Sequence, residues 1–112
     1  MIPVIIESPY AGEHKTNNLI YLQECIHYSV NSGEAPFASH RMYTGALNDD
    51  VPEERKLGIE AGYCWMNLAK KVIFCVDEGM SEGMKKALIT AVKLEKDIVF
   101  RYIRRDATEE EE

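Results

Sequence analysis

Three groups of polar side chains in the sequence could bind a small ligand or act on it. Each group follows a short apolar segment, and together they offer carboxylates, histidines, tyrosines and hydroxyl groups. The groups are Glu7, Ser8, Pro9, Tyr10, His14 and Lys15; then Ser39, His40, Arg41, Tyr43, Asp49 and Asp50; and then Asp77, Ser81, Glu82 and Gly83. Ser81 is a good helix N-cap, and helix N-termini attract anions. These groups therefore suit a polar ligand with a phosphate or a sugar.

Several of these residues also have a purely structural interpretation. Ser81 and Asp50 could serve only as helix caps, Asp77 could only close a turn, and His40 could be an ordinary loop histidine. The sequence has no phosphate-binding glycine loop, no GxSxG nucleophile motif and no metal-ligand cluster. Residue types and spacing alone predict a polar ligand site with neither a metal nor a cofactor.

The elements that must position these groups alternate between strands and helices. Short apolar runs predict strands at residues 3–7, 36–38, 72–76 and 98–100. Apolar residues spaced three and four apart predict helices at 17–32, from 49 or 50 to 68, and at 81–94, with a long polar loop at 39–50. This order predicts an α/β domain, specifically a flavodoxin-like three-layer sandwich with a small parallel sheet of strand order 2-1-3-4. In such a sheet the three polar groups should meet at one edge.

The second predicted helix has two apolar faces. One face is Leu57, Ala61, Cys64, Trp65 and Leu68, and the other is Ile59, Tyr63 and Met66. Gly58 and Gly62 permit a close approach by another backbone. A helix that is apolar on two sides is either deeply buried or shared with a partner chain. We therefore expect a homo-oligomer, a dimer or larger, that uses this helix and its second face.

The bulk composition limits the class of protein. The 112 residues suit a single domain at 1–104, followed by an acidic tail at 105–112 that we expect to be disordered. The net charge is −6, and residues 105–112 account for −4 of it, which argues against binding to duplex nucleic acid. No segment is apolar enough to cross a membrane or act as a secretion signal. Cys25, Cys64 and Cys75 lie in apolar segments, as expected for buried, reduced thiols in a cytoplasmic protein.

An ordered series of short motifs runs through residues 2 to 102. It comprises IESPYAG at 6–12, GEAPFASH at 33–40, MYT at 42–44, LNDD at 47–50, PEER at 52–55, Gly58, Gly62, and SEGM at 81–84. This series resembles small phage and bacterial proteins related to the nucleoside 2-deoxyribosyltransferases and the deoxynucleoside-monophosphate N-glycosidases. Many of those proteins are known only as domains of unknown function.

The resemblance implies a flavodoxin-like oligomer that cleaves or exchanges the N-glycosidic bond of a deoxynucleoside or its monophosphate. In the wider family, a glutamate early in the helix after the third strand is the nucleophile. Carried over to this sequence, Ser8 and Tyr10 would line the sugar side, and Asp50 or Asp77 would contact the base or act as an acid. Ser81 and Gly83 would meet a phosphate. The rest of the expected ligand-binding set is Pro9, Ser39, His40, Tyr43 and Met84.

Position 87 departs from the pattern of the proteins that the sequence resembles. Their helix begins Ser-Glu-Gly-Met-x-x-Glu, whereas here the last position is Ala87. Alanine cannot act as a nucleophile, so either this function is lost or another carboxylate, such as Glu82, supplies it. Two hypotheses follow. One is a nucleoside- or nucleotide-binding protein with a weakened or inactive N-glycosidase or deoxyribosyltransferase site. The other is a non-enzymatic protein that sequesters a nucleotide signal, for example in phage counter-defence within the host cytoplasm.

Overall fold

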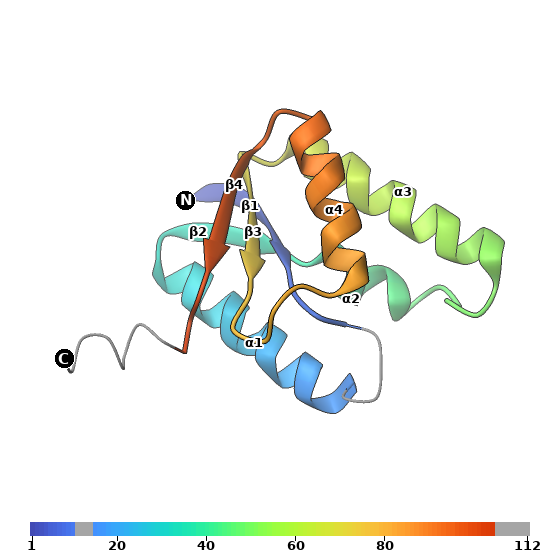
Figure 1. Cartoon of the computed structure of the whole chain (residues 1–112), viewed down its shortest axis with the longest axis horizontal. Helices are drawn as coiled ribbons and strands as arrows, with labels where there is room; N and C mark the ends of the chain where they lie inside the picture. Colours follow the sequence, from blue (N-terminus) through green and yellow to red (C-terminus); the bar gives the residue numbers. More distant parts are fainter. Residues whose placement is uncertain (11–14, 105–112) are drawn as a thin grey trace.

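Four parallel strands form the centre of the fold. The computed structural model describes residues 1–10 and 15–104, so the predicted tail at 105–112 and His14 lie outside the described residues. The strands are β1 (Ile2–Glu7), β2 (Glu34–Phe37), β3 (Lys71–Cys75) and β4 (Asp97–Arg101). Their order in the sheet is β2-β1-β3-β4, with every neighbouring pair parallel (Figure 1). The predicted α/β fold and strand order are therefore confirmed.

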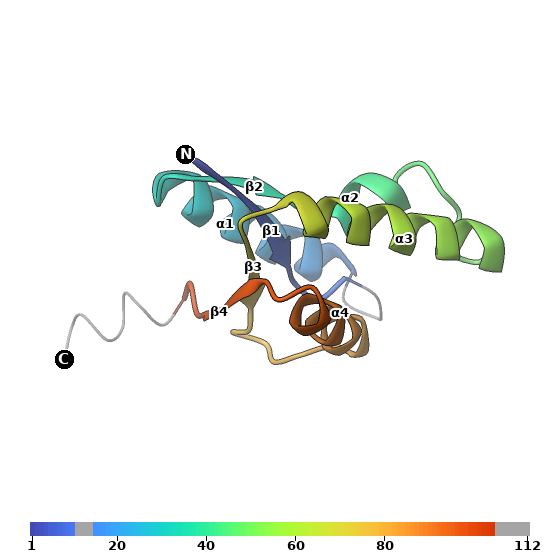
Figure 2. The same ribbon diagram turned by 90° about the horizontal axis from the view of Figure 1, so that it is seen from above.

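Four helices connect the strands and cover both faces of the sheet. They are α1 (Lys15–Asn31), α2 (Ser39–Thr44), α3 (Pro52–Leu68) and α4 (Glu82–Lys93). α1 lies on one face, and α3 and α4 lie on the other, which gives three layers (Figure 2). Each strand-to-helix connection at the carboxyl end of β1, β2 or β3 therefore opens at the same edge of the sheet, as the sequence predicts.

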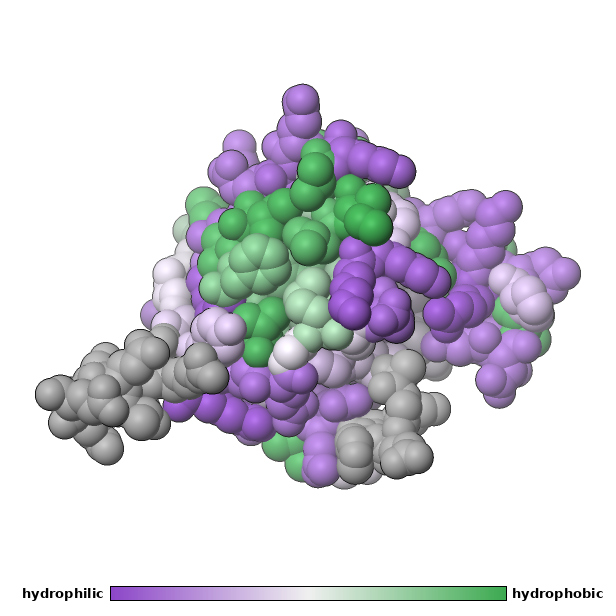
Figure 3. Space-filling view, viewed as in Figure 1, coloured by the Kyte–Doolittle hydropathy of each residue, from purple (hydrophilic) through white to green (hydrophobic). Residues whose placement is uncertain are grey.

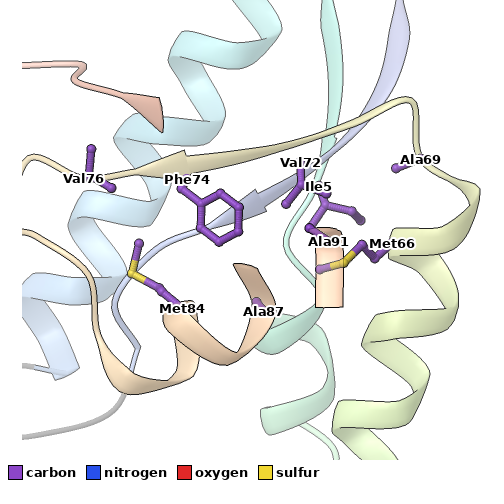
Figure 4. Close-up of a cluster of buried hydrophobic side chains, with 9 residues drawn as sticks. All are labelled: Ile5, Met66, Ala69, Val72, Phe74, Val76, Met84, Ala87 and Ala91. Atoms are coloured by element: carbon purple, nitrogen blue, oxygen red, sulfur yellow. The ribbon is translucent and has the colours of Figure 1, made fainter. Parts of the chain in front are cut away.

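Alternation along the strands divides the apolar residues between two cores. Val4 and Ile6 of β1 face α1, whereas Ile5 between them faces α3 and α4. The cluster on the α3 and α4 side, which we call the α4-side core, contains Ile5, Met66, Ala69, Val72, Phe74, Val76, Met84, Ala87 and Ala91 (Figure 4). The side-chain direction of any β1 residue therefore follows from its position relative to Ile5.

The segment at 39–50 is not entirely a loop, so that prediction is wrong for its first half. Residues 39–44 form the short helix α2, which begins where the carbonyl of Ala38 accepts hydrogen bonds from the N–H groups of Arg41 and Met42. The Thr44 hydroxyl donates to the carbonyl of His40 at 2.6 Å. α2 packs against α3 at Gly62, where a Cβ atom would lie 2.9 Å from the Ser39 Oγ. A helix of six residues is too short to show an apolar period, which is why the sequence pattern misses it.

The predicted partner-facing stripe of α3 is wrong for Tyr63 and Met66, which pack toward the sheet, whereas Ile59 is 42% exposed. Met66, assigned to the partner-facing stripe, is only 1% exposed and belongs to the α4-side core. The exposed apolar side chains come mainly from the other stripe, where Leu57 and Leu68 are 59% and 67% exposed. Cys64 lies on that outer face and is exposed, so the prediction of three buried thiols holds only for Cys25 and Cys75. Amphipathicity at this helix identified two faces but not which one meets the sheet.

Two other local predictions also need correction. The helix α3 begins after Val51, whose backbone is extended, and no side chain caps it, so Asp50 is not its N-cap. β2 begins at Glu34, two residues before the predicted strand, because this acidic residue is buried by specific partners. Its carboxylate accepts hydrogen bonds from Ser29 at 2.7 Å and Arg101 at 2.9 Å, and pairs with Lys71 at 3.0 Å. The Arg101 hydrogen bond, despite the opposing effect of burial, lowers the pKa of Glu34 to about 2.

Candidate functional site

A cleft of about 510 Å³ opens at the carboxyl edge of the sheet. Side chains from the end of β1, from α2, from the loop after α2, from α3 and from the start of α4 line it. The lining residues are Glu7, Ser8, Tyr10, Ser39, His40, Tyr43, Thr44, Leu47, Asp49, Arg55, Gly58, Ile59, Gly62, Tyr63, Ser81, Glu82, Gly83, Met84, Lys86 and Ala87. Most of the polar residues that the sequence analysis singled out therefore meet in one place.

The end of β1 contributes a buried hydroxyl group to the cleft. Ser8 is 4% exposed, and its Oγ has no hydrogen-bond partner among the described residues. The chain then continues to Tyr10, whose carbonyl accepts a hydrogen bond from the Asn18 side chain of α1 at 3.4 Å. Buried hydroxyl groups are normally hydrogen-bonded, so Ser8 has an unused capacity to bind a ligand or water.

A histidine that also lines the cleft has the same unused capacity. The ring of His40 in α2 packs edge-on against Tyr10, with 5.3 Å between the ring centroids. Both of its ring nitrogens are buried without a partner in the described part of the chain. Burial, together with the nearby charge of Arg41, lowers the pKa of His40 to about 4. The ring is therefore neutral near pH 7 and offers one donor and one acceptor to a ligand.

The start of α4 supplies the anion-binding end of a helix. The backbone of Ser81 is extended, and its Oγ accepts a hydrogen bond from the N–H of Met84 at 3.2 Å, which confirms the predicted N-cap. The first N–H groups of a helix have no partner within the helix, so those of Glu82 and Gly83 are available to a ligand. The Glu82 side chain is highly exposed and pairs with Lys85 at 3.2 Å. Such a solvated pair is a poor setting for a nucleophile.

Two cations from different helices also line the cleft. Arg55 comes from α3 and Lys86 from α4, and neither forms an ion pair with a carboxylate within residues 1–10 and 15–104. Together with the helix end at Gly83 they add positive charge to the cleft, which favours an anion. Neither cation was expected in the site from the sequence, because both helices must be in place before the two charges share one cleft.

Glu7, the last residue of β1, is a further acidic group in the cleft. It was grouped with the first loop but not selected as a site residue. Burial raises the pKa of Glu7 to about 7. An acidic residue at the end of an apolar strand is the sequence signal that could have identified Glu7. The strand places such a side chain partly in the core, where burial raises the pKa of a carboxyl group.

Ala87 lies where the resemblance places the nucleophile, one turn inside α4. It is 4% exposed, it packs with Met84 in the α4-side core, and it borders the cleft (Figure 4). A longer side chain at this position would start from the floor of the cleft. Ala87 is therefore a buried residue at the border of the cleft, and its methyl side chain carries no reactive group.

The family model for a domain of unknown function, DUF7768, matches residues 2–101. The chain belongs to the DUF7768 family. No curated protein sequence matches it. Among solved structures, the DUF7768 domain is similar to the 2-deoxyribosyltransferase of the psychrotolerant bacterium Bacillus psychrosaccharolyticus, described as a biocatalyst for the synthesis of antiviral and antitumoral nucleosides. The TM-score is 0.71 at 14% identity, over 88% of this chain and 70% of that chain, so the two proteins share a fold.

Three of the predicted site residues in this DUF7768 domain do not line the cleft, namely Pro9, Asp50 and Asp77. Asp50 is exposed, and its neighbour Asp49 takes the place at the rim. The Asp77 carboxylate accepts hydrogen bonds from the Tyr21 hydroxyl at 2.6 Å and from the N–H groups of Ile103 and Arg104 at 3.0 and 3.1 Å. It thus holds the chain after β4 against α1, which is a structural role.

The predicted lack of a metal site and of a membrane span can be examined only within the described residues. There, no group of three or more histidine, cysteine, aspartate or glutamate side chains is placed to hold a metal ion. Of the helices in the same residues, none has both the length and the apolar character required to span a membrane.

Proposed function

We propose that this DUF7768 domain binds a nucleoside or nucleotide in the cleft, in a site of the N-glycosidase or 2-deoxyribosyltransferase type whose catalysis is weak or absent. The observation that carries this proposal is the set of buried polar atoms without partners, the Ser8 Oγ and both His40 ring nitrogens, at the ligand-binding edge of an α/β sheet. The similarity of fold to a 2-deoxyribosyltransferase supports a nucleoside as the ligand.

The size and lining of the cleft suit such a ligand. A volume of about 510 Å³ lies within the range of small-molecule sites, which is roughly 300–1,000 Å³. Tyr10, Tyr43 and Tyr63 offer aromatic surface for a base, while Ser8 and His40 offer hydrogen bonds to a sugar. These features favour a flat aromatic group joined to a polyhydroxyl group.

A phosphate on the sugar would fit the end of the cleft at α4. The helix N-terminus at Gly83 and the side chains of Arg55 and Lys86 would face it. Glu82 reduces this attraction only modestly, because its charge is solvated and paired with Lys85. We therefore expect a deoxynucleoside monophosphate to bind more tightly than the corresponding nucleoside.

Ala87 is the reason to expect weak or absent catalysis. The sequence resemblance assigns the nucleophile to this position, which here carries only a methyl group at the border of a cleft lined by polar side chains. This observation also favours the second candidate function, in which the protein sequesters a nucleotide signal without turning it over. In either case we expect the protein to bind its ligand in the cytoplasm, where nucleotides are made and used.

Calorimetric titration with the common deoxynucleosides and their monophosphates tests the binding proposal. We expect at least one ligand to bind, and Ser8→Ala to weaken it about tenfold by removing one hydrogen bond. Ser32→Ala, an exposed serine at the end of α1, is the matched control and should change nothing. Mass analysis of the bound fraction then separates the functions, since free base indicates an enzyme and unchanged nucleotide indicates a sequestering protein. If no ligand of either class binds, the cleft is vestigial and the proposal is wrong.

A further inference from the structure

The side chain of Glu7 points to the face of the sheet that α4 covers, and Ala87 of α4 lies on that same side. Side chains alternate along a strand, and Ile5 of β1 faces the α4-side core, so Glu7 two residues later faces the same way. Glu7 is paired in register with Phe74 of β3, which belongs to that core together with Ala87 (Figure 4). Both Glu7 and Ala87 line the cleft. Glu7 therefore contributes a carboxyl group to the cleft from β1, whereas Ala87 of α4 borders the same cleft without one.

Among the residues that the structure describes, Glu7 differs from Glu34 and Asp77 in that its carboxyl group has no partner. Glu34 is held by Arg101, Lys71 and Ser29, and Asp77 by a tyrosine hydroxyl and two backbone N–H groups. Within the described residues, the Glu7 carboxyl group makes no hydrogen bond or ion pair, and burial alone raises its pKa to about 7. Leaving an acid buried and unpaired destabilises the fold, and such groups cluster at functional sites.

We propose that Glu7 supplies, from β1, the carboxyl group that position 87 lacks, and that it acts as the general base in hydrolysis of the N-glycosidic bond of a bound deoxynucleoside or its monophosphate. This inference rests on the function proposed above and names the residue that carries whatever turnover the site retains. Glu82, the other acid considered for this role, is exposed and paired with Lys85.

The reaction needs only water and the bound nucleoside. The water oxygen forms a bond to C1′ of the sugar while the bond between C1′ and the base nitrogen breaks, and the electron pair of that bond leaves with the base. The carboxylate of Glu7 accepts a proton from the attacking water and then passes it to the departing base. The products are a free base and deoxyribose or its phosphate, and Glu7 returns to its carboxylate form.

A general base fits the surroundings of Glu7 better than a covalent nucleophile does. General-base catalysis is most efficient when the pKa of the base lies near the working pH. The other charged or titratable groups that line the cleft are Tyr10 after β1, His40 and Tyr43 on α2, Asp49 in the loop after α2, Arg55 and Tyr63 on α3, and Glu82 and Lys86 on α4. His40 is neutral above about pH 4, so it does not titrate near pH 7. The rate should therefore rise with pH as Glu7 loses its proton and level off above about pH 7.

The test compares Glu7→Gln with the wild-type protein against the common deoxynucleosides and their monophosphates. Base release is followed by chromatography from pH 5 to 9, and binding is followed by calorimetry. We expect Glu7→Gln to lower the release rate at least 100-fold and to remove its rise with pH, while the ligand still binds. Glu60→Gln, which removes a carboxylate from the exposed face of α3, is the matched control and should keep the wild-type rate and profile.

A second variant covers the case in which Glu7→Gln does not fold. Glu7→Ala leaves space in the cleft, and added formate should then restore base release in proportion to its concentration. Unchanged release by Glu7→Gln, or absence of rescue by formate, would overturn the role of Glu7. Wild-type protein that binds a ligand but never releases base would also overturn it and leave the binding function standing. Loss of binding to every ligand would instead overturn the proposed function itself.

Discussion

At position 87, a single substitution would introduce the carboxyl group that the sequence resemblance leads us to expect there. Ala87 is buried at the floor of the cleft, one turn into α4, and glutamate is a good helix former whose charge is favourable near a helix N-terminus. We expect Ala87→Glu to fold and to release free base from at least one deoxynucleoside or monophosphate. The increase over the wild-type rate should be at least about 100-fold, because covalent nucleophiles commonly contribute that much or more.

The new carboxyl group would share the cleft with Glu7, and each would raise the pKa of the other if both were charged. Ala87→Gln has the same size without the charge and is the matched control; it should release no more base than the wild type. Chromatography of the products measures all three proteins. An Ala87→Glu protein that is folded, binds its ligand and stays as slow as Ala87→Gln would contradict the assignment of position 87.

Glu34 is a second residue whose chemistry can be tested, through stability alone. Its pKa is lowered from 4.5 to about 2 on folding, chiefly by the hydrogen bond from Arg101. A lowered pKa means that the carboxylate contributes stability above about pH 4.5, and that this contribution is lost as the pH falls from 4.5 to 2. Glu34→Gln should therefore lower the free energy of unfolding by about 3 kcal/mol at pH 7. The difference from the wild type should shrink toward pH 2.

Urea denaturation at several pH values measures this effect. Glu60→Gln removes an exposed carboxylate whose salt bridge to Lys56 is long, at 3.9 Å, and it should change stability by less than about 0.5 kcal/mol at any pH. A difference for Glu34→Gln that stays constant from pH 7 to pH 2 would show that the buried charge is not the stabilising group.

At the level of the elements, the sequence predicted the strands and the longer helices well because their signals are local. The apolar run at Val72–Val76 and the spacing of Met84, Leu88 and Ala91 are properties of neighbouring residues, and the structure confirms both elements. β2 starts at Glu34, which is polar in sequence but buried among Ser29, Lys71 and Arg101, the last of which reaches it from β4. A pairing of two residues so far apart in the chain leaves no local signal.

The packing of α2 on α3 gives a prediction that separates two similar glycines. A Cβ atom at position 62 would lie 2.9 Å from the Ser39 Oγ, whereas one at position 58 would lie 3.4 Å from the Leu47 Cδ1, the end of a flexible side chain. Alanine gains about 1 kcal/mol over glycine in a helix. Gly58→Ala should therefore stabilise the protein by about 0.5–1 kcal/mol. Gly62→Ala should destabilise it by about 1–2 kcal/mol, because overpacking outweighs the helix gain.

Thermal denaturation of the two variants measures this difference, with each glycine acting as the control for the other. Gly62→Ala should also weaken ligand binding, since Ser39 and His40 begin α2 and line the cleft together. Equal stabilisation by both substitutions would mean that α2 moves freely away from α3, and that their close packing does not position His40.

At the level of the whole molecule, the position of the cleft and most of its predicted lining residues followed from the sequence, but not all of its residues did. Parallel strands bring their carboxyl ends to one edge, so Ser8, Tyr10, His40 and Ser81 converge as the sequence predicted. Asp77 has the right position in sequence, but its carboxylate turns to Tyr21 and the chain after β4. Arg55 and Lys86 enter the site from two helix faces whose orientation depends on tertiary packing. Residue type and position along the chain therefore predicted the edge of the sheet at which the cleft lies. Tertiary packing decides which side chains line it.

The last prediction concerns assembly through α3, which extends with α2 beyond the edge of the sheet (Figure 1). Leu57, Trp65 and Leu68 on the outer stripe of α3 are exposed apolar side chains, and clustered exposure of this kind marks an interaction surface. Trp65 is already oriented, since its indole N–H donates to the Tyr43 hydroxyl at 2.8 Å and its ring packs on Phe37. A second apolar patch lies over α4 and β4 and includes Ile89, Val92 and Phe100 (Figure 3). Two copies that pair through α3 would cover the outer stripe, not the predicted stripe that contains the buried Met66.

We expect light scattering at low micromolar concentration to give more than one chain per particle. Lysine at an exposed position leaves the fold intact but adds a charge that must lose its water when an interface closes, so Leu57→Lys with Leu68→Lys should yield monomers. The matched control is Ile89→Lys with Val92→Lys, which places the same two charges on the α4 and β4 patch and should leave the assembly unchanged. Monomers from the control pair alone would move the interface to α4 and β4. A wild-type protein that is already a folded monomer would contradict assembly through either surface, because the α3 stripe and the α4 and β4 patch would then both be exposed to water in the folded protein.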